Sequence, residues 1–272
     1  MFQIVSALLV AMSAEDLALS AINVLLLLMT ASVVLAVSVP DLNVLLLYGK
    51  TREASTKHVV LLPGLDYFLS IYLPKRYFVH FYIVSVVCSL AVVATRWEEH
   101  SPSGWVLTGL MLVQGLRRLF ECIFLEKPNP KALIHISHYL VGIFFYTLVN
   151  AVVYLAFSFP DTPSSLCTAL AIAIFTIASV YQYLFHRHLA SLVKYTLPSF
   201  SLFRLVACPH YFSEIFIYAS FAFVTPRACR PSVYMIIVWV LVNLSASAKQ
   251  TQVYYQQKFN TAQPYAIIPY IY

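Results

Sequence analysis

Seven apolar stretches recur along this chain of 272 residues, and they constrain its fold more than any other feature. Each is roughly 15 to 23 residues long, which suits an α-helix that crosses a hydrocarbon core of about 30 Å. Only 10% of the residues are charged and 61% are hydrophobic, whereas soluble domains have about a quarter of their residues charged. The sequence therefore predicts an all-α, polytopic membrane protein with a single domain over residues 1–272. The predicted helices cover residues 17–39, 77–95, 104–125, 137–158, 165–185, 211–226 and 232–252.

Basic residues in the loops predict the orientation of these helices, because Lys and Arg are retained in cytosolic loops. Most of the loop Lys and Arg residues fall on the side that includes the C-terminus. We therefore expect a cytosolic C-terminus and a lumenal N-terminus. The 17 basic residues are too few and too scattered for a surface that follows a phosphate backbone, so nucleic acid is not an expected partner.

Ionisable side chains inside the third predicted helix are the next informative feature, since a charge in hydrocarbon is costly and normally faces a cavity or a partner. The polar residues on one face of this helix are Gln114, Arg117, Arg118 and Glu121. Glu121 can pair with both arginines at helical spacing, which leaves one positive charge for an anion. The alternative interpretation is a pair of arginines that extend from the helix end toward water.

Three further helices carry polar residues near the same membrane face. These residues are Gln182 and His186 in the fifth helix, His210 and Glu214 in the sixth, and Gln252, Tyr255 and Lys258 at the end of the seventh. A single group of this kind could be a hydrogen-bonded contact between helices. Because four helices carry polar residues at one face, we expect an aqueous pocket for a polar, anionic ligand.

Metal sites and nucleotide-binding loops have little support in the sequence. His135 and His138, like His186 and His188, are closely spaced, but a membrane di-iron oxidase needs more clustered histidines than this chain has, so no metal site is expected. The six glycines offer no G-x-G-x-x-G pattern. A bound dinucleotide would therefore not lie in a Rossmann fold.

Several motifs occur in an order that points to a known family. They are YGKT (Tyr48–Thr51), LPKRYFVHFY (Leu73–Tyr82), LRRLFEC (Leu116–Cys122), IH with Tyr139 four residues on, CPHYFSEI (Cys208–Ile215) and the AIIPYIY ending. From about residue 45 to the end, the chain resembles the polyprenol reductases, a branch of the steroid 5α-reductase family. The resemblance implies a seven-helix enzyme of the endoplasmic reticulum membrane that holds NADPH between its helices.

The resemblance also implies a reaction and roles for single residues. The enzyme would reduce the α-isoprene double bond of a long polyprenoid, which supplies dolichol for protein N-glycosylation. An aldehyde suits hydride addition better than an alcohol, because the developing enolate charge can be stabilised. The implied cofactor-binding residues are Lys50, Arg117, Arg118, Gln182, His210, Glu214 and Lys258. The implied substrate-binding residues are His80 and Tyr82, and the implied catalytic residues are Tyr255, Tyr72, Glu121 and Gln252.

Departures from the family pattern support a second hypothesis. Tyr72 stands where the family has an acidic residue, and Gln252 stands where it has a histidine that could relay a proton. Basic residues are missing before Ala266. The alternative is therefore a catalytically weakened polyprenoid-binding membrane protein. A receptor, a transporter or an isoprenylcysteine methyltransferase fits the motif order less well. Polyprenoid and membrane lipid are the expected partners, and no protein partner is predicted.

Overall fold

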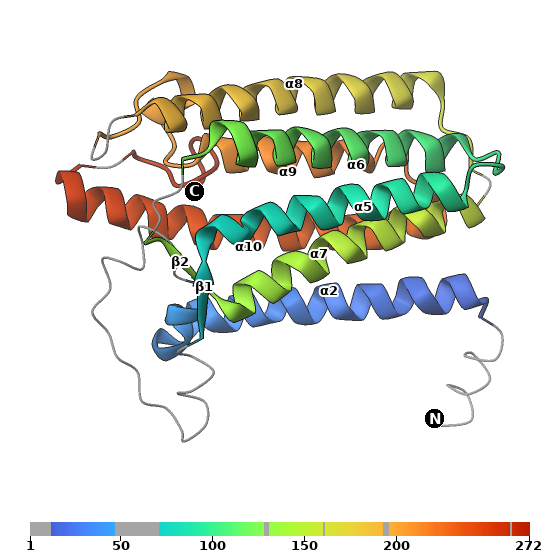
Figure 1. Ribbon diagram of the computed structural model, residues 1–272, viewed down its shortest axis with the longest axis horizontal. Helices are drawn as coiled ribbons and strands as arrows, with labels where there is room; N and C mark the ends of the chain where they lie inside the picture. Colours follow the sequence, from blue (N-terminus) through green and yellow to red (C-terminus); the bar gives the residue numbers. More distant parts are fainter. Residues whose placement is uncertain (1–11, 47–70, 128–130, 160, 193–195, 262) are drawn as a thin grey trace.

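The computed structural model describes residues 12–46, 71–127, 131–159, 161–192, 196–261 and 263–272. Within these ranges, seven α-helices form an elongated bundle in which consecutive helices run in opposite directions (Figure 1). Each helix overlaps one predicted segment. The helices are α2 (Ala14–Ser38), α5 (Val79–Thr95), α6 (Pro102–Phe120), α7 (Ile136–Leu155), α8 (Ser165–Ser191), α9 (Pro209–Phe221) and α10 (Arg230–Phe259).

Short elements connect or extend these helices. Five are 3-10 helices, η1 (Pro40–Leu46), η2 (Lys75–Phe78), η4 (Ala156–Ser158), η5 (Ser201–Arg204) and η6 (Arg227–Cys229), and η3 (Glu121–Leu125) is a π-helical turn that continues α6. In the bundle, α8 packs along α9, α5 packs against α6 and α7, and α10 packs against α2 and α9.

Five of the described helical segments are long and apolar enough to cross a membrane: 14–38, 75–95, 136–158, 165–191 and 227–259. The chain is therefore a multi-pass membrane protein. Helix α6 carries two arginines in its last turn, and α9 has only 13 residues, about 20 Å, and ends at Phe221, earlier than predicted. Whether these two helices also cross the bilayer, as seven spans require, remains a prediction.

The start of α2 and the end of α10 lie at opposite ends of the bundle (Figure 1). This arrangement agrees with termini on opposite sides of the membrane, while the cytosolic assignment stays a prediction. We call the end at which α10 finishes the C-terminal end of the bundle. The polar residues of α6, α8 and α9 described below all lie toward this end.

Helices α8 and α10 are longer than the sequence predicted. The segments 165–185 and 232–252 were placed by apolar character, whereas the helices continue to Ser191 and Phe259. The added turns carry polar side chains that contact other parts of the protein, so apolar character stops before the helix does.

Serine side chains begin three of the helices. Ser13, Ser101 and Ser164 each accept a hydrogen bond from a backbone N–H in the first turn of α2, α6 and α8. Pro102 occupies the start of α6, where its missing N–H costs nothing. Asn260 ends α10 in the left-handed conformation, with φ of 52°.

A small antiparallel sheet is an addition to the predicted all-α fold. Strand β1 (Tyr72–Pro74) pairs with β2 (Leu133–His135), with Tyr72 opposite His135. The strands lead into η2 and α5 and into α7, so they hold the starts of α5 and α7 together. Pairs of three-residue strands give too short an alternation to be recognised in a sequence.

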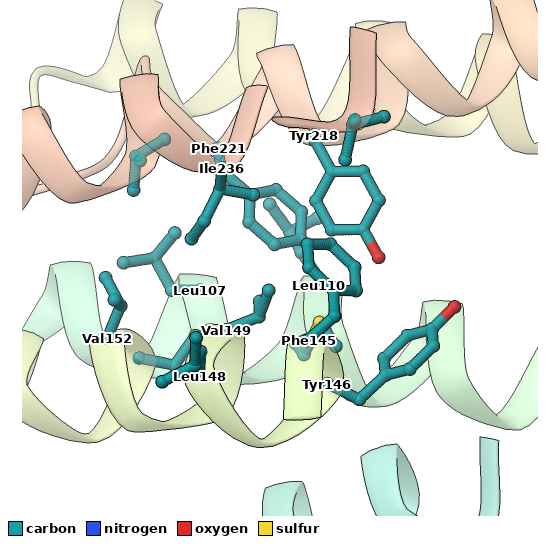
Figure 2. Close-up of a cluster of buried hydrophobic side chains, with 14 of the residues drawn as sticks. Leu107, Leu110, Phe145, Tyr146, Leu148, Val149, Val152, Tyr218, Phe221 and Ile236 are labelled. Carbon is teal, nitrogen blue, oxygen red and sulfur yellow. The ribbon is translucent and has the colours of Figure 1, made fainter. Parts of the chain in front are cut away.

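All seven described α-helices contribute to the main apolar core, and Figure 2 shows the part of it between α6, α7, α9 and α10. Phe145 stacks on Trp239 at 4.3 Å and meets Tyr218 edge-on at 5.5 Å between ring centroids. Leu110 and Val149 are buried in the same cluster. In a bilayer, close packing of this kind holds helices together, because lipid is as apolar as the side chains themselves.

Candidate functional site

Polar and charged side chains from α5, α6, α8 and α9 meet toward the C-terminal end of the bundle. Half of them are buried and the other half are half-buried. We call this set the polar cluster: Tyr82, Gln114, Arg117, Arg118, Glu121, Glu126, Gln182, His186, His210 and Glu214.

Glu121 is the centre of the cluster and is fully buried. Its carboxylate forms ion pairs with Arg117 and Arg118, and its Oε2 lies 2.6 Å from Nδ1 of His186. Glu121 is the first residue of η3, and π-helical turns frequently mark functional sites. The predicted pairing of Glu121 with both arginines is thus present.

Arg118 has more partners than the sequence indicated. Its Nη2 lies 3.2 Å from Glu126 and donates a hydrogen bond of 2.8 Å to the Tyr82 hydroxyl. Burial disfavours the charged form of Glu126, but Arg118, His186 and Lys75 together outweigh it and lower the pKa of this carboxyl. Glu126 is therefore ionised at neutral pH.

The expected surplus positive charge is absent from this cluster. Besides Glu121, the carboxylates of Glu126 and Glu214 lie among the described residues around the two arginines. Glu126 follows the π-helical turn and is eight residues from Arg118 in sequence, so regular helical spacing does not predict their contact. The cluster can therefore hold arginine side chains rigidly, but it is not an open anion site.

Two glutamines connect Arg117 to Glu214. Arg117 Nη2 donates to the amide oxygen of Gln114 at 2.6 Å and also to that of Gln182. The amide nitrogen of Gln114 lies 3.1 Å and 3.3 Å from the two Glu214 oxygens, and that of Gln182 donates to Glu214 as well. Glu214 is thus held between α6 and α8 by neutral donors.

His210 lies beside these groups in the first turn of α9. Its carbonyl oxygen accepts a hydrogen bond of 3.1 Å from Gln182, and its ring centroid lies 5.3 Å from that of His186. The structure therefore brings together seven of the residues that the sequence assigned to a site. They are Tyr82, Arg117, Arg118, Glu121, Gln182, His210 and Glu214.

Tyr255 and Gln252 lie elsewhere. Tyr255 is buried in a second apolar cluster with Ala207 and Cys208 at the start of α9. Gln252 donates a hydrogen bond of 2.8 Å to the carbonyl of Gln263 and accepts one from Lys249. The amide of Gln252 therefore links the C-terminal segment to α10 by a hydrogen bond. Its hydrogen bonds within the described residues are made to Gln263 and Lys249, not to the polar cluster.

Three other assigned residues are also separate from the cluster, and one cannot be placed. The Tyr72 ring meets His135 edge-on at 5.3 Å, and His80 Nδ1 lies 3.0 Å from the Tyr139 hydroxyl. Lys258 is exposed in the last turn of α10. Lys50 lies outside the described residues.

The comparisons with known proteins identify the family. Residues 133–272 match the sequence profile described as 3-oxo-5-alpha-steroid 4-dehydrogenase. The chain is 38% identical to the polyprenal reductase of Saccharomyces cerevisiae over 228 residues, which cover 82% of this chain and 84% of the yeast protein. The chain belongs to the 3-oxo-5-alpha-steroid 4-dehydrogenase family. The resemblance derived from the motifs is thereby confirmed.

More distant relatives are also similar in sequence to this chain over most of its length. The polyprenal reductase of Danio rerio is 26% identical and covers 82% of this chain and 85% of its own length. The polyprenal reductase of Homo sapiens is 25% identical, with 79% and 80% covered. The family profile includes Gln182, His210 and Glu214 of the polar cluster, whereas the arginines of α6 precede it.

Sequence reasoning assigned no role to Gln114, Glu126 or His186, although Gln114 and His186 were recognised as part of the polar faces. Helical spacing reveals which residues share a face, but it does not reveal which partner they meet across the bundle. Within the described residues, no group of three or more His, Cys, Asp or Glu side chains is placed to hold a metal ion.

Proposed function

We propose that this protein is an NADPH-dependent polyprenal reductase of the endoplasmic reticulum membrane. It would reduce the α-isoprene double bond of a long-chain polyprenal and so supply dolichol for protein N-glycosylation. The observation that carries this proposal is the 38% identity to a yeast protein named polyprenal reductase, over more than four fifths of both chains.

The polar cluster and its surroundings suit such a reaction. When a hydride adds to the β-carbon of an unsaturated aldehyde, negative charge develops on the carbonyl oxygen, and fixed donors stabilise that charge best in a site that excludes water. Arg118 and Tyr82 supply such donors, and both are buried. Beside them, the apolar core offers surroundings compatible with an isoprenoid chain.

The acceptors of the cluster fit the nicotinamide end of NADPH, which supplies the hydride when it is bound. A carboxamide presents two N–H donors, and Glu214 with the carbonyl of His210 provides acceptors at the start of α9. The two arginines are poor candidates for binding the phosphate groups of NADPH, since both already pair with carboxylates. The resemblance implied that these arginines lie near the phosphates; we assign the phosphate end to Lys258 instead and keep Lys50 at the adenosine end, as the resemblance implies.

The alternative of a weakened, non-catalytic binder has less support. It rested partly on Gln252, where the family has a histidine, but the amide of Gln252 is bonded to the backbone of Gln263. A change at this position therefore removes no group from the polar cluster. The identity to the yeast reductase also favours an active enzyme.

The proposal is tested with purified protein in detergent micelles, incubated with polyprenal and either NADPH, NADH or no cofactor. We expect the saturated aldehyde, detected by mass spectrometry, with NADPH and little of it without cofactor. Glu214→Gln should weaken NADPH binding, while Glu98→Gln, at an exposed position after the end of α5, serves as the matched control. Binding of polyprenal without any reduction would support the non-catalytic alternative instead.

A further inference from the structure

We propose that Tyr82 is the proton donor to the carbonyl oxygen of the substrate, with Arg118 as the group that stabilises the resulting phenolate. This inference rests on the proposed function as a polyprenal reductase.

The hydroxyl of Tyr82 is used only as an acceptor. Arg118 Nη2 donates to it at 2.8 Å, and the guanidinium carbon lies 4.8 Å from the centroid of the Tyr82 ring. Among the described residues, no acceptor for the phenolic proton is recorded. Because the side chain is 9% exposed, leaving this donor unused carries a free-energy cost, which a ligand oxygen would remove.

Arg118 equips this hydroxyl to release its proton. An oxygen that accepts a hydrogen bond from a guanidinium group is better able to carry negative charge, since the cation stabilises the phenolate. The guanidinium group is itself fixed by ion pairs with Glu121 and Glu126. Arg118 can therefore support the phenolate without a change of position.

Tyr82 also lies where the polar cluster meets the apolar interior. Its ring meets Tyr146 edge-on, with the centroids 5.5 Å apart. The Tyr146 ring meets that of the preceding core residue, Phe145, at 5.3 Å between centroids. Figure 2 shows Tyr146 at the edge of this group, with its hydroxyl pointing away from Leu148 and Val152. A polyprenal also has a polar and an apolar part, since a carbonyl oxygen ends its long apolar chain.

The other tyrosines that were assigned as acids are less well placed. Tyr72 packs against His135, and Tyr255 is buried in the second apolar cluster. The hydroxyl of Tyr139 lies 3.0 Å from His80. The hydroxyl of Tyr82, in contrast, accepts a hydrogen bond from Arg118 of the cluster.

Bound NADPH would supply a hydride to the β-carbon and be oxidised to NADP+, while the electrons of the double bond move toward the carbonyl oxygen. The O–H bond of Tyr82 breaks, and its proton passes to that oxygen to give an enol. The enol then returns this proton to the Tyr82 phenolate while the α-carbon takes a proton from water, and the hydroxide that remains is neutralised by a proton from the solvent. One hydride and one proton are thus added to the substrate, and Tyr82 is regenerated.

The experiment compares Tyr82→Phe with Tyr181→Phe, which removes a hydroxyl from the exposed face of α8. We expect Tyr82→Phe to lower kcat for polyprenal by at least about 100-fold, as loss of a general acid does. The dissociation constant for NADPH should stay close to that of the wild type, and Tyr181→Phe should retain full turnover. Replacing Tyr82 by the more acidic 3-fluorotyrosine should keep turnover and move the alkaline limb of the pH–rate profile to lower pH.

The outcomes separate the two proposals. A wild-type protein that reduces polyprenal, together with an equally active Tyr82→Phe variant, would overturn the role of Tyr82 and leave the proposed function intact. Parallel loss of NADPH binding and turnover in Tyr82→Phe would assign Tyr82 to packing and would also overturn it. A folded wild-type protein that does not reduce polyprenal would overturn both.

Discussion

Gln114 on α6 and Gln182 on α8 make the same two connections: each accepts a hydrogen bond from Arg117 and donates one to Glu214. The amide oxygen of each side chain therefore faces a cation and its nitrogen faces a carboxylate. This arrangement fixes the orientation of both amides and holds Glu214 at a set distance from Arg117.

Because Gln114 bonds to both Arg117 and Glu214, we predict that Gln114 positions Glu214. The sequence alone did not indicate this role for Gln114. Gln114→Leu leaves Arg117 and Glu214 each without one buried partner, which should lower the free energy of unfolding by about 1–3 kcal/mol. NADPH affinity should fall as well, since Glu214 is less well oriented. Chemical unfolding in micelles and cofactor titration test this, with the exposed Gln257→Leu as the control. Unaltered affinity in the Gln114 variant would contradict the positioning role.

Two ion pairs of different burial offer a matched comparison of stability. Glu121 is fully buried between two arginines, whereas Glu99, the partner of Arg96, has a side chain that is 46% exposed. Glu121→Gln should destabilise the protein by about 3–5 kcal/mol, because it leaves buried positive charge poorly compensated. Glu99→Gln should cost less than about 1 kcal/mol. Similar unfolding midpoints for the two variants would show that Glu121 is not the centre of the cluster.

The ion pairs of Arg118 predict how it affects the cofactor. Because Arg118 is compensated by Glu121 and Glu126, we expect it to act on the site as a whole and not on the 2′-phosphate alone. Arg118→Leu should therefore raise the KM for NADPH and for NADH by similar factors. Steady-state kinetics with both cofactors measure this. A selective effect on NADPH would instead place Arg118 at the extra phosphate.

Glu126 predicts a pH dependence of stability. Its pKa is lowered from 4.5 in the folded state, so its contribution is present above that value and is lost as the pH falls through the folded pKa. Wild-type stability should therefore decline at acidic pH, below about 4.5. In Glu126→Gln this decline should be smaller, as measured by thermal unfolding between pH 3 and pH 7. An identical pH dependence in both proteins would rule out the contribution of Glu126.

The sequence predicted the positions of the α-helices in the described ranges well, because apolar length is a local property. It also placed Arg117, Arg118 and Glu121 on one face correctly, since their contacts follow helical spacing. The contact between Gln114 and Glu214 joins residues 100 apart in sequence, and no local pattern encodes it. Tyr255 shows the converse, since a residue near polar positions in the sequence is buried in an apolar cluster.

Glu126 and Gln252 show two further limits. The π-helical turn of η3 shifts the register after Glu121, so ideal helix geometry does not bring Glu126 to Arg118. Gln252 was compared with a catalytic histidine by its place in a motif. Its partner is the backbone of Gln263, which only the path of the C-terminal segment could reveal.

If this chain transfers hydride to a polyprenal, an isotope label on the cofactor must appear in the product. NADPH carrying deuterium at both C4 positions is incubated with purified protein and polyprenal, and the product is analysed by mass spectrometry and NMR. We expect a saturated aldehyde with one deuterium at the β-carbon and none at the α-carbon. A folded protein that binds both ligands but yields no deuterated product would contradict it.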